Sequence, residues 1–312
     1  MQLIRGLHNL RPLTNGCVAT IGNFDGVHLG HQAIFRQLAE QGQRLNLPVG
    51  VVFFEPQPAE FFVPGRAEPR ISRLREKLAL LAELPVDFAF CLRFDSSLAE
   101  MEPADFVNRV LVKGIGVRYL VVGPDFRFGR RRAGDYEFLR RQGDDQGFTV
   151  VTVDRYDVGG ERVSSTRVRR ALKAGDFDEV TRLLGRRYSI AGRVARGDQL
   201  GRTIGFPTAN IGVLRRAICL SGVYAVRVTG AGLTASPAVA NIGSRPTVDG
   251  QRQVLEVHLL DYAGDLYGQR LDVDFCYRLR DEQKFASLDA LKTQIESDEQ
   301  RARAWFAAED RV

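Results

Sequence analysis

The sequence predicts an α/β protein with two domains, a parallel sheet covered by helices followed by a small antiparallel barrel or sandwich. A chain of 312 residues is too long for one ordinary core and suits two domains. Up to about residue 155, apolar strand candidates alternate with helical segments, which is typical of a parallel sheet. After about residue 186, short strand candidates follow one another with glycines between them. We therefore expect domains at residues 1–186 and 187–312.

The first half contains a series of apolar strands and amphipathic helices. The strand candidates are nearly continuous apolar runs, as strands buried on both faces require, and they span residues 17–21, 49–54, 88–92, 118–122 and 148–153. Helical periodicity begins at His31 and is also present in residues 72–84, 103–112 and 165–184. Pro103 is expected at a first helical position, where no amide hydrogen is needed. In such a fold, ligands bind beyond the carboxyl ends of the strands.

The second half has the pattern of a β domain closed by one helix. Its strand candidates span residues 188–194, 223–229, 238–242, 254–260 and 271–278. Residues 287–306 predict a long helix with a polar face, in which the side chains available for packing are Leu288, Leu291, Ile295 and Trp305. We expect this helix to cover the β domain.

Composition and charge narrow the classes of function. The formal net charge is +6, but no aromatic residues are interleaved with the basic clusters at 130–132 and 167–170, as a stacking platform requires. We therefore expect no nucleic-acid partner. No apolar run approaches the roughly 18 residues of a membrane helix, and no leader pattern is present. Because the four cysteines lack paired spacing, we expect reduced thiols in a cytoplasmic protein. The oligomeric state is left open.

The segment at residues 21–31 is the most informative part of the chain. It reads Ile-Gly-Asn-Phe-Asp-Gly-Val-His-Leu-Gly-His and lies between a predicted strand and a predicted helix. Free amides and the positive dipole end of a helix N-terminus attract anions, and glycines allow close approach. His28 and His31 would face the same anion. An ordinary glycine-rich turn and a zinc site are the alternatives, although the cysteines and the other two histidines lie far apart in the sequence.

Two further segments have features of phosphate sites. Residues 121–129 form a strand followed by a glycine-rich turn that carries Asp125 and then a basic run, for which an ordinary surface turn is the alternative. Residues 163–169 place Ser164, Ser165 and Thr166 ahead of a helix with Arg167 in its first turn. The hydroxyls can cap the helix or bind phosphate oxygens. An anion beside Arg167 would relieve its conflict with the helix dipole.

The ten-residue pattern Gly-x-Phe-Asp-Gly-Val-His-x-Gly-His resembles the first signature of the bacterial bifunctional riboflavin kinase and FAD synthetase family. The resemblance implies a Rossmann-like nucleotidylyltransferase domain and a C-terminal riboflavin kinase barrel. It also implies that His28 and His31 hold the α-phosphate of ATP during attack by the FMN phosphate, with Mg²⁺ bridging phosphate oxygens. The residues of this signature expected to bind ATP are Gly22, Phe24, Asp25 and Gly30.

The second and third phosphate segments resemble later signatures of the same family. Asp125 matches a position that is often Asn, which puts its contact in doubt. The resemblance implies that Ser164, Ser165, Thr166 and Arg167 bind the ATP phosphates and the leaving pyrophosphate. The chain departs from the family at residues 54–58, where Gln57 replaces the usual His and cannot carry charge near neutral pH. Gln57 is therefore not included in the predicted catalytic set.

Residues 197–210 contain a glycine-rich segment that ends in Pro-Thr-Ala-Asn and lacks the GK[ST] of a Walker A loop. A structural loop is the alternative, but the segment resembles the riboflavin kinase signature. The resemblance implies that Thr208 and Asn210 hold Mg²⁺ and ATP phosphates, with Gly201 in the phosphate loop.

A kinase must also activate the hydroxyl of its substrate, and a carboxylate is the simplest base. Glu256 is the candidate, because alternation places it on the face opposite Leu255 and Val257, and a Tyr-Gly pair follows at residues 267–268 as in the family. A solvated carboxylate is the alternative. Arg280 and Phe285 are candidates for flavin contacts, for which surface packing is equally compatible.

Together these motifs predict a bifunctional enzyme. We expect phosphorylation of riboflavin to FMN in the C-terminal domain and adenylylation of FMN to FAD in the N-terminal domain, with ATP and Mg²⁺ used in both. Two alternatives are a single adenylyltransferase with a non-catalytic barrel and an RNA-binding or flavin-sensing regulator. The second alternative leaves the HxGH and PTAN patterns unexplained.

Overall fold

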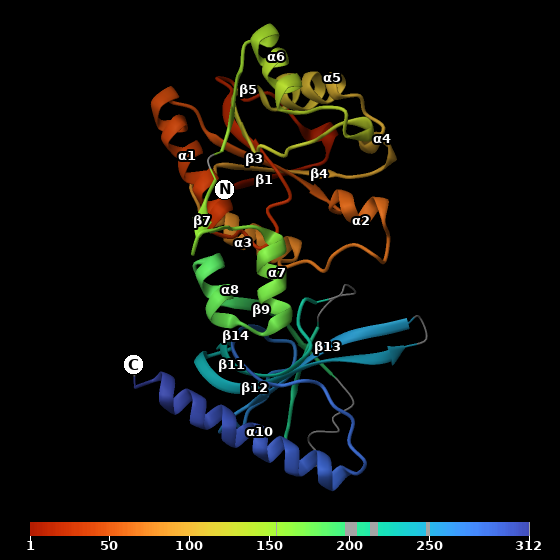
Figure 1. Cartoon of the computed structure of the whole chain (residues 1–312), viewed down its shortest axis with the longest axis vertical. Helices are drawn as coiled ribbons and strands as arrows, with labels where there is room; N and C mark the ends of the chain where they lie inside the picture. The colour runs from red at the N-terminus through yellow and green to blue at the C-terminus, as the bar shows by residue number, and fades with distance from the viewer. Residues whose placement is uncertain (154, 197–204, 213–217, 248–249, 312) are drawn as a thin grey trace. The chain divides into compact units, whose positions relative to one another are not determined.

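The chain folds into two compact units (Figure 1). The computed structural model describes residues 1–153, 155–196, 205–212, 218–247 and 250–311. One unit comprises Met1–Glu68 and Ser72–Val163, and the other comprises Pro69–Ile71 and Ser164–Val312. A three-residue segment of the first half therefore belongs to the unit that the second half forms. The expected division between residues 186 and 187 stays a prediction.

The first unit contains a six-stranded sheet in which every pairing is parallel. The strand order is β1-β4-β3-β2-β5-β6. These strands are β1 (Gln2–Arg5), β2 (Cys17–Ile21), β3 (Val49–Glu55), β4 (Phe88–Arg93), β5 (Val117–Val122) and β6 (Thr149–Thr152). The predicted parallel sheet is confirmed. Sequence reasoning missed β1, because its four residues at the sheet edge are only partly buried and carry no long apolar run.

The strand order reverses beside β2. From β2 the chain proceeds to β3 and β4 on one side of the strand, and it then returns to β5 and β6 on the other side. In open parallel sheets the crevice at such a reversal is where ligands bind. The turns that follow β2 and β5 therefore occupy the favoured position for a site.

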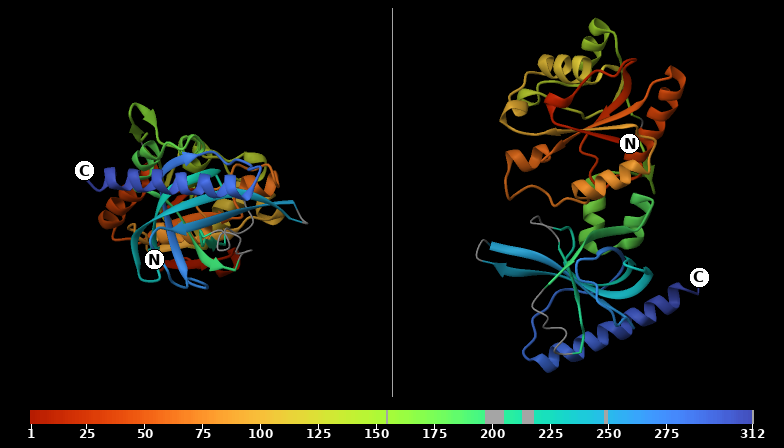
Figure 2. Two further views of the ribbon diagram at one scale, coloured as in Figure 1. Left: turned by 90° about the horizontal axis from the view of Figure 1, so that it is seen from below. Right: turned by 180° about the vertical axis from the view of Figure 1, so that it is seen from behind.

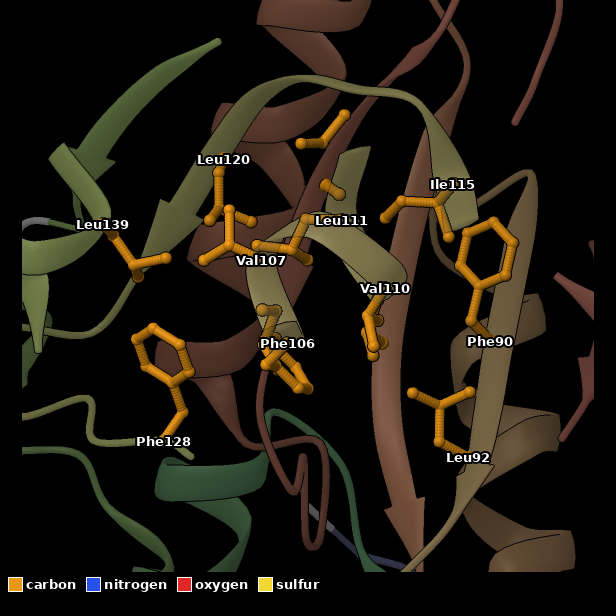
Figure 3. Packing of buried hydrophobic residues seen from close by; sticks show 14 of the residues in the cluster. Phe90, Leu92, Phe106, Val107, Val110, Leu111, Ile115, Leu120, Phe128 and Leu139 are labelled. Carbon is orange, nitrogen blue, oxygen red and sulfur yellow. The ribbon is translucent and has the colours of Figure 1, made fainter. Parts of the chain in front are cut away.

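Helices cover both faces of the sheet, so the strands are buried on both sides. Val51 and Phe53 of β3 pack in the cluster that contains residues of α1 (Leu29–Leu45) and α3 (Leu74–Ala82). The alternate residues Val52 and Phe54 pack in the cluster shown in Figure 3. That cluster includes side chains of α4 (Ser96–Ala99), α5 (Pro103–Phe106), the π-helix η2 (Val107–Ile115) and α6 (Tyr136–Gln146). The helix predicted at 103–112 is thus a short α-helix continued as a π-helix.

The remaining elements of the first unit are short. They are the 3-10 helices η1 (Leu7–Asn9) and η3 (Arg130–Arg132), the helix α2 (Pro58–Phe62), and the strands β7 (Asp157–Val158) and β8 (Glu161–Arg162). β7 and β8 form a two-stranded antiparallel sheet of their own.

The helical stretch predicted at residues 165–184 is confirmed and consists of two helices, α7 (Ser165–Ala174) and α8 (Phe177–Leu184). Gly175 ends α7 in the left-handed conformation with φ +72°, which glycine adopts without a steric penalty. The carboxylate of Asp176 then accepts a hydrogen bond from Glu179 N and caps α8. Gly175 and Asp176 mark the break between the two helices, but the apolar periodicity of the sequence continues across both residues.

The second unit contains a closed antiparallel barrel, so the barrel prediction is confirmed and the sandwich is excluded (Figure 2). Its strand order is β10-β13-β12-β11-β14-β9, and β9 pairs with β10 to close it. The strands are β9 (Tyr188–Ala195), β10 (Ala209–Ile211), β11 (Gly222–Gly230), β12 (Leu233–Thr247), β13 (Gly250–Leu259) and β14 (Arg270–Arg280). The three-residue β10 was not predicted, because it is too short to show alternation. Phe177 of α8 contacts the rings of Tyr224 and Phe275.

The long terminal helix α10 (Leu288–Glu309) packs on the barrel, as expected. Ala302 and Phe306, one turn apart, are buried in a cluster with Val223 and Ala225 of β11, and Trp305 packs against this cluster. Leu288 was expected to pack but is 59% exposed, because it is the first residue of α10, and the buried positions of the helix begin only at Asp298. None of the described helices is long and apolar enough to span a membrane.

The core of the first unit generates a test of stability. We expect Leu111→Ala to lower the free energy of unfolding by about 2–5 kcal/mol, because the fully buried side chain leaves a cavity. Leu45→Ala is the matched control, since Leu45 is 41% exposed, and its effect should stay below about 0.5 kcal/mol. Thermal unfolding of the full chain measures both, and equal effects would contradict this description of the core.

Candidate active sites

The turn between β2 and α1 has an unusual backbone. Phe24 and Val27 have φ values of +48° and +43°, and Gly26 between them has +80°. Left-handed conformations are costly for phenylalanine and valine, and such strain is found where surrounding contacts hold a functional loop. His28 ends the turn as the N-cap of α1, where its Nδ1 accepts a hydrogen bond from His31 N at 3.3 Å.

The rings of His28 and His31 are stacked, with centroids 3.6 Å apart and an interplanar angle of 15°. Nδ1 of His31 is buried and has no hydrogen-bond partner among the described residues. Burial holds the pKa of His31 well below its usual range, and the neighbouring His28 and Lys77 lower it further. The lowered pKa favours the neutral imidazole, and Nδ1 of His31 is a buried polar atom without a hydrogen-bond partner among the described residues.

The predicted glycines of this signature lie in close packing. A Cβ on Gly30 would lie 3.2 Å from Nδ1 of His28 and 3.3 Å from the carbonyl oxygen of Val163, so a side chain there would displace the imidazole. A Cβ on Gly22 would lie 3.1 Å from the ring of Phe24. Phe24 is itself buried, and its ring forms a T-shaped contact with the ring of His31, with centroids 5.1 Å apart. These residues shape the turn, and their contact with ATP stays a prediction.

Asp25 is 2% exposed and binds the loop before α3. Its Oδ1 accepts hydrogen bonds from Ser72 N at 3.0 Å and Ser72 Oγ at 3.4 Å, while Gly26 N donates to Ser72 Oγ at 2.9 Å. The carboxylate therefore has a structural task in this conformation. Sequence reasoning missed Ser72 as a partner of the turn, since nothing local marks it.

The turn after β5 lies beside the turn after β2, because Thr20 of β2 pairs with Val121 of β5. The structure thus brings the first two predicted signatures to neighbouring strand ends. Asp125 is exposed and forms an ion pair with Arg162 at 3.0 Å. Gln57, at the start of α2, is buried, and its Nε2 has no hydrogen-bond partner among the described residues.

The third phosphate segment belongs to the second unit, so its relation to His28 and His31 stays a prediction. Ser164 Oγ caps α7 by accepting from Arg167 N at 3.3 Å, while Ser165 is half-buried and Thr166 exposed. Arg167 is buried, and its Nη2 lies 2.6 Å from Oε1 of Glu179 on α8. The anion expected beside this arginine is therefore present as a protein carboxylate.

Glu256 lies in a row of polar residues on the outside of the barrel. In the strand register it is directly opposite Asn210 of β10 on one side and Asn241 of β12 on the other. Its neighbours Leu255 and Val257 are fully buried, whereas Glu256 is partly exposed, as the predicted alternation requires. Directly paired residues point to the same face of a sheet, so the three polar side chains share this face. Residues 240–247 also resemble the family, but sequence reasoning assigned no role to Asn241.

A pocket of about 560 Å³ adjoins this row and includes Thr208 and Asn210. The other lining residues come from β9, from β10 and the segment before it, and from β13 and the loop after it: Val194, Pro207, Ala209, Val257, Leu259, Tyr262, Ala263, Gly264, Asp265, Leu266 and Tyr267. Pro207 is held by its carbonyl oxygen, which lies 2.9 Å from Nδ1 of His258. A lining of mostly apolar residues with a few polar groups is typical of a nucleotide or small-molecule site. The predicted Gly201 lies outside the described residues.

The loop that closes this pocket is bound to β9. Tyr267 N donates to Oδ1 of Asp265 at 2.9 Å, and Gly268 N donates to the carbonyl oxygen of Val194 at 2.9 Å. Gly268 has φ +74°, a conformation that glycine permits, which explains the glycine of the Tyr-Gly pair. The guanidinium of Arg196 lies 5.8 Å from the ring centroid of Tyr267.

Oxygen donors predominate around the barrel site. Thr208, Asn210 and Glu256 offer a hydroxyl, an amide oxygen and a carboxylate, which suit Mg²⁺, a cation that is usually held by one or two carboxylates together with substrate phosphates. The direct pairing of Asn210 with Glu256 places two of these donors side by side. Among the described residues, no cluster of three or more His, Cys, Asp or Glu side chains could hold a metal by itself.

Arg280 and Phe285 lie together, with the guanidinium 5.6 Å from the ring centroid. Nε of Arg280 donates to both carboxylate oxygens of Asp298, at 3.0 and 2.9 Å, and Asp298 on α10 is 2% exposed. This pair attaches the terminal helix to β14. The predicted contact of Arg280 and Phe285 with flavin is not tested by these contacts.

Comparisons with known proteins agree with the two units. Residues 10–167 match the family model described as FAD synthetase, and residues 184–306 match the model described as riboflavin kinase. The chain is 52% identical over 307 residues to the bifunctional riboflavin kinase/FMN adenylyltransferase of Escherichia coli (strain K12), and it is 54% identical over 308 residues to that of Pseudomonas fluorescens. Each comparison covers 98% of both chains.

A solved structure shares the fold of the whole chain. It is described as a macrolide-efflux protein from Streptococcus pneumoniae, and it superposes with a TM-score of 0.82 at 30% identity, covering 98% of this chain and 100% of that chain. Together, the two domain matches and the full-length relatives show that the chain belongs to the family of bifunctional riboflavin kinases/FMN adenylyltransferases. The resemblance inferred from the motifs is confirmed.

The attachment of α10 generates a prediction about two ion pairs. We expect Asp298→Ala to lower the free energy of unfolding by about 3–5 kcal/mol, because Arg280 then keeps a largely buried charge without its carboxylate. Asp261→Ala is the control, since its pair with Arg303 also attaches α10 but is exposed. It should cost at most about 2 kcal/mol, most of it from alanine in the left-handed conformation at φ +56°. Thermal unfolding distinguishes them. A larger loss for Asp261→Ala would contradict the assignment.

Proposed function

We propose that this chain makes FAD from riboflavin in two ATP-dependent steps. The barrel unit phosphorylates riboflavin to FMN, and the parallel-sheet unit transfers AMP from ATP to FMN with release of pyrophosphate. The observation that carries the proposal is the match of each unit to its own family model, together with at least 52% identity to bifunctional relatives along nearly the whole chain.

In the kinase step, Glu256 is proposed to accept the proton of the 5′-hydroxyl of riboflavin while that oxygen attacks the γ-phosphorus of ATP. The bond from this phosphorus to the β,γ-bridging oxygen breaks, and ADP leaves. The partly exposed position of Glu256 beside Asn210, next to the pocket with Thr208, supports this role. Thr208 and Asn210 are proposed to hold Mg²⁺ and the ATP phosphates, with Gly201 in the phosphate loop. When bound, Mg²⁺ neutralises charge on the phosphate oxygens. Arg280 and Phe285 are proposed flavin contacts.

In the adenylyl step, an oxygen of the FMN phosphate attacks the α-phosphorus of ATP, and pyrophosphate leaves on the opposite side. His28 and His31 are proposed to hold the α-phosphate and the charge that develops on it. The unpartnered Nδ1 of His31 supports this role. Gly22, Phe24, Asp25, Gly30 and Asp125 are proposed to form the rest of the nucleotide site in this unit.

Three further proposals concern the third phosphate segment, the domain division and the location of the enzyme. Ser164, Ser165, Thr166 and Arg167 are proposed phosphate-binding residues, and residues 1–186 and 187–312 are the proposed functional domains. The two family matches fall mainly on either side of this division. We also propose that the enzyme works in the cytoplasm, because both reactions consume ATP and the four cysteines form no disulfide.

The two sites should be separable by mutation. We expect Glu256→Gln to lower the rate of FMN formation from riboflavin by about 10²–10⁴-fold, because the general base is lost, while FAD formation from supplied FMN continues. His31→Ala should instead lower the rate of FAD formation from FMN, while FMN formation from riboflavin continues. Glu296→Gln, at an exposed position of α10, is the control. Chromatographic separation of flavins after incubation with ATP and Mg²⁺ gives both rates.

Other outcomes of this assay favour other functions. If the unmodified protein makes FAD only from FMN, the barrel is a non-catalytic module. If it converts neither substrate, the assignment to flavin synthesis fails for this chain. Loss of both activities in a folded Glu256→Gln variant would contradict the separation into two sites.

Metal removal provides a further prediction. We expect excess EDTA to stop both reactions, since without Mg²⁺ the phosphate charges are no longer neutralised. Added Mg²⁺ should restore both reactions. The same flavin separation measures the rates, and incubation with the Mg²⁺ complex of EDTA is the control. A reaction that continues in excess EDTA would show that its site does not need the metal.

A further inference from the structure

Lys77 is a charged residue in an apolar environment. It lies on the face of α3 that also carries Leu81, four residues further on, and both side chains are fully buried. A lysine is almost never fully buried unless its ammonium group is paired. Here Nζ donates to the carbonyl oxygen of Asn23 at 2.5 Å and lies 5.2 Å from the ring centroid of Phe53. A leucine at this position would fit the core and avoid the desolvation penalty.

Lys77 and Ser72 bind the same short stretch of backbone. Lys77 contacts Asn23, and Ser72 contacts Asp25 and Gly26 through its amide and hydroxyl. These contacts fall within the left-handed turn that leads to His28 and His31. The residues come from α3 and the loop before it, so the turn is held by a segment about 50 positions away in the sequence.

We propose that Lys77 and Ser72 are positioning residues for adenylyl transfer, which hold the backbone of residues 23–26 so that His28 and His31 are presented to the α-phosphate. The inference rests on the proposed function of these two histidines. Neither residue touches the reacting atoms in this account. They act by maintaining a strained turn, and misplacement of reacting groups by about 1 Å can cost on the order of 10²-fold in rate.

The charge of Lys77 adds an electrostatic effect that a purely structural contact lacks. The groups that lower the pKa of His31 are its buried surroundings, His28 from the turn and Lys77 from α3. Asp25, the carboxylate of the same turn, is instead hydrogen-bonded to Ser72. Removal of the ammonium charge therefore raises the pKa of His31 towards its usual value.

The test compares variants of the full-length protein in the conversion of FMN to FAD. We expect Lys77→Met, which keeps the length of the side chain but removes its charge, to lower kcat about 10- to 100-fold with a smaller change in KM for FMN and ATP. The imidazole resonances of this four-histidine chain, followed by NMR against pH without nucleotide, should show a raised pKa for His31. Riboflavin phosphorylation should be unchanged.

Two further variants keep the test decisive. Ser72→Ala should also lower kcat for FAD formation, but with a smaller shift in the pKa of His31, because Lys77 keeps its charge. Lys113→Met, at an exposed position of η2, should leave both kcat and the pKa unchanged. If Lys77→Met does not fold, Ser72→Ala alone decides the positioning role.

The outcomes separate the inference from the proposed function. An unmodified enzyme that makes no FAD from FMN contradicts the proposed function. An active enzyme whose folded Lys77→Met and Ser72→Ala variants keep kcat within twofold of the unmodified value overturns the positioning role alone. A lowered kcat with an unchanged pKa of His31 in Lys77→Met overturns the electrostatic part.

Discussion

Successive side chains of a β-strand point to opposite faces of its sheet. In both candidate sites, the position of the polar groups depends on which of these faces are buried. β2 is covered by helices on both faces and is buried along its whole length, so no exposed catalytic group can lie within it. The polar side chains that β2 leads to therefore lie in the turn after Ile21. In the barrel, only alternate residues face the core, which allows Glu256 to lie outside while Leu255 and Val257 remain buried.

The two sites use different means to present their polar groups. In the barrel, the strand register alone aligns Asn210, Glu256 and Asn241, because paired residues on neighbouring strands point the same way. In the sheet unit, the stacked histidines follow a turn whose backbone conformation is unfavourable for Phe24 and Val27. That turn depends on tertiary contacts, whereas the barrel row follows from regular secondary structure.

Several charged residues that the motifs single out already have protein partners. Arg167 pairs with Glu179, and Arg280 pairs with Asp298. Buried arginines need such carboxylates, because an isolated buried charge is strongly unfavourable. A ligand phosphate that engaged Arg167 would have to share or replace the contact with Glu179. These residues therefore contribute to the attachment of helices whether or not they bind ligands.

Much of the fold was predictable from the sequence. The five apolar runs of the first half became parallel strands, because continuous apolar character leaves burial on both faces as the only favourable outcome. The short elements were not predictable: β10 has three residues, and the break at Gly175 lies within a continuous apolar pattern. Short segments carry too little periodicity, so their conformation is decided by the strands and helices around them.

The sequence by itself determined the family, the two-unit architecture and the residue types available for phosphate chemistry, because motifs and periodicities are local properties of the chain. Only the tertiary structure decided which distant residues meet. Lys77 and Ser72 support the turn that carries His28 and His31, and Asn241 lies beside Glu256. No local pattern marks such partners, since the free energy that selects them comes from burial and hydrogen bonding between segments far apart in the sequence.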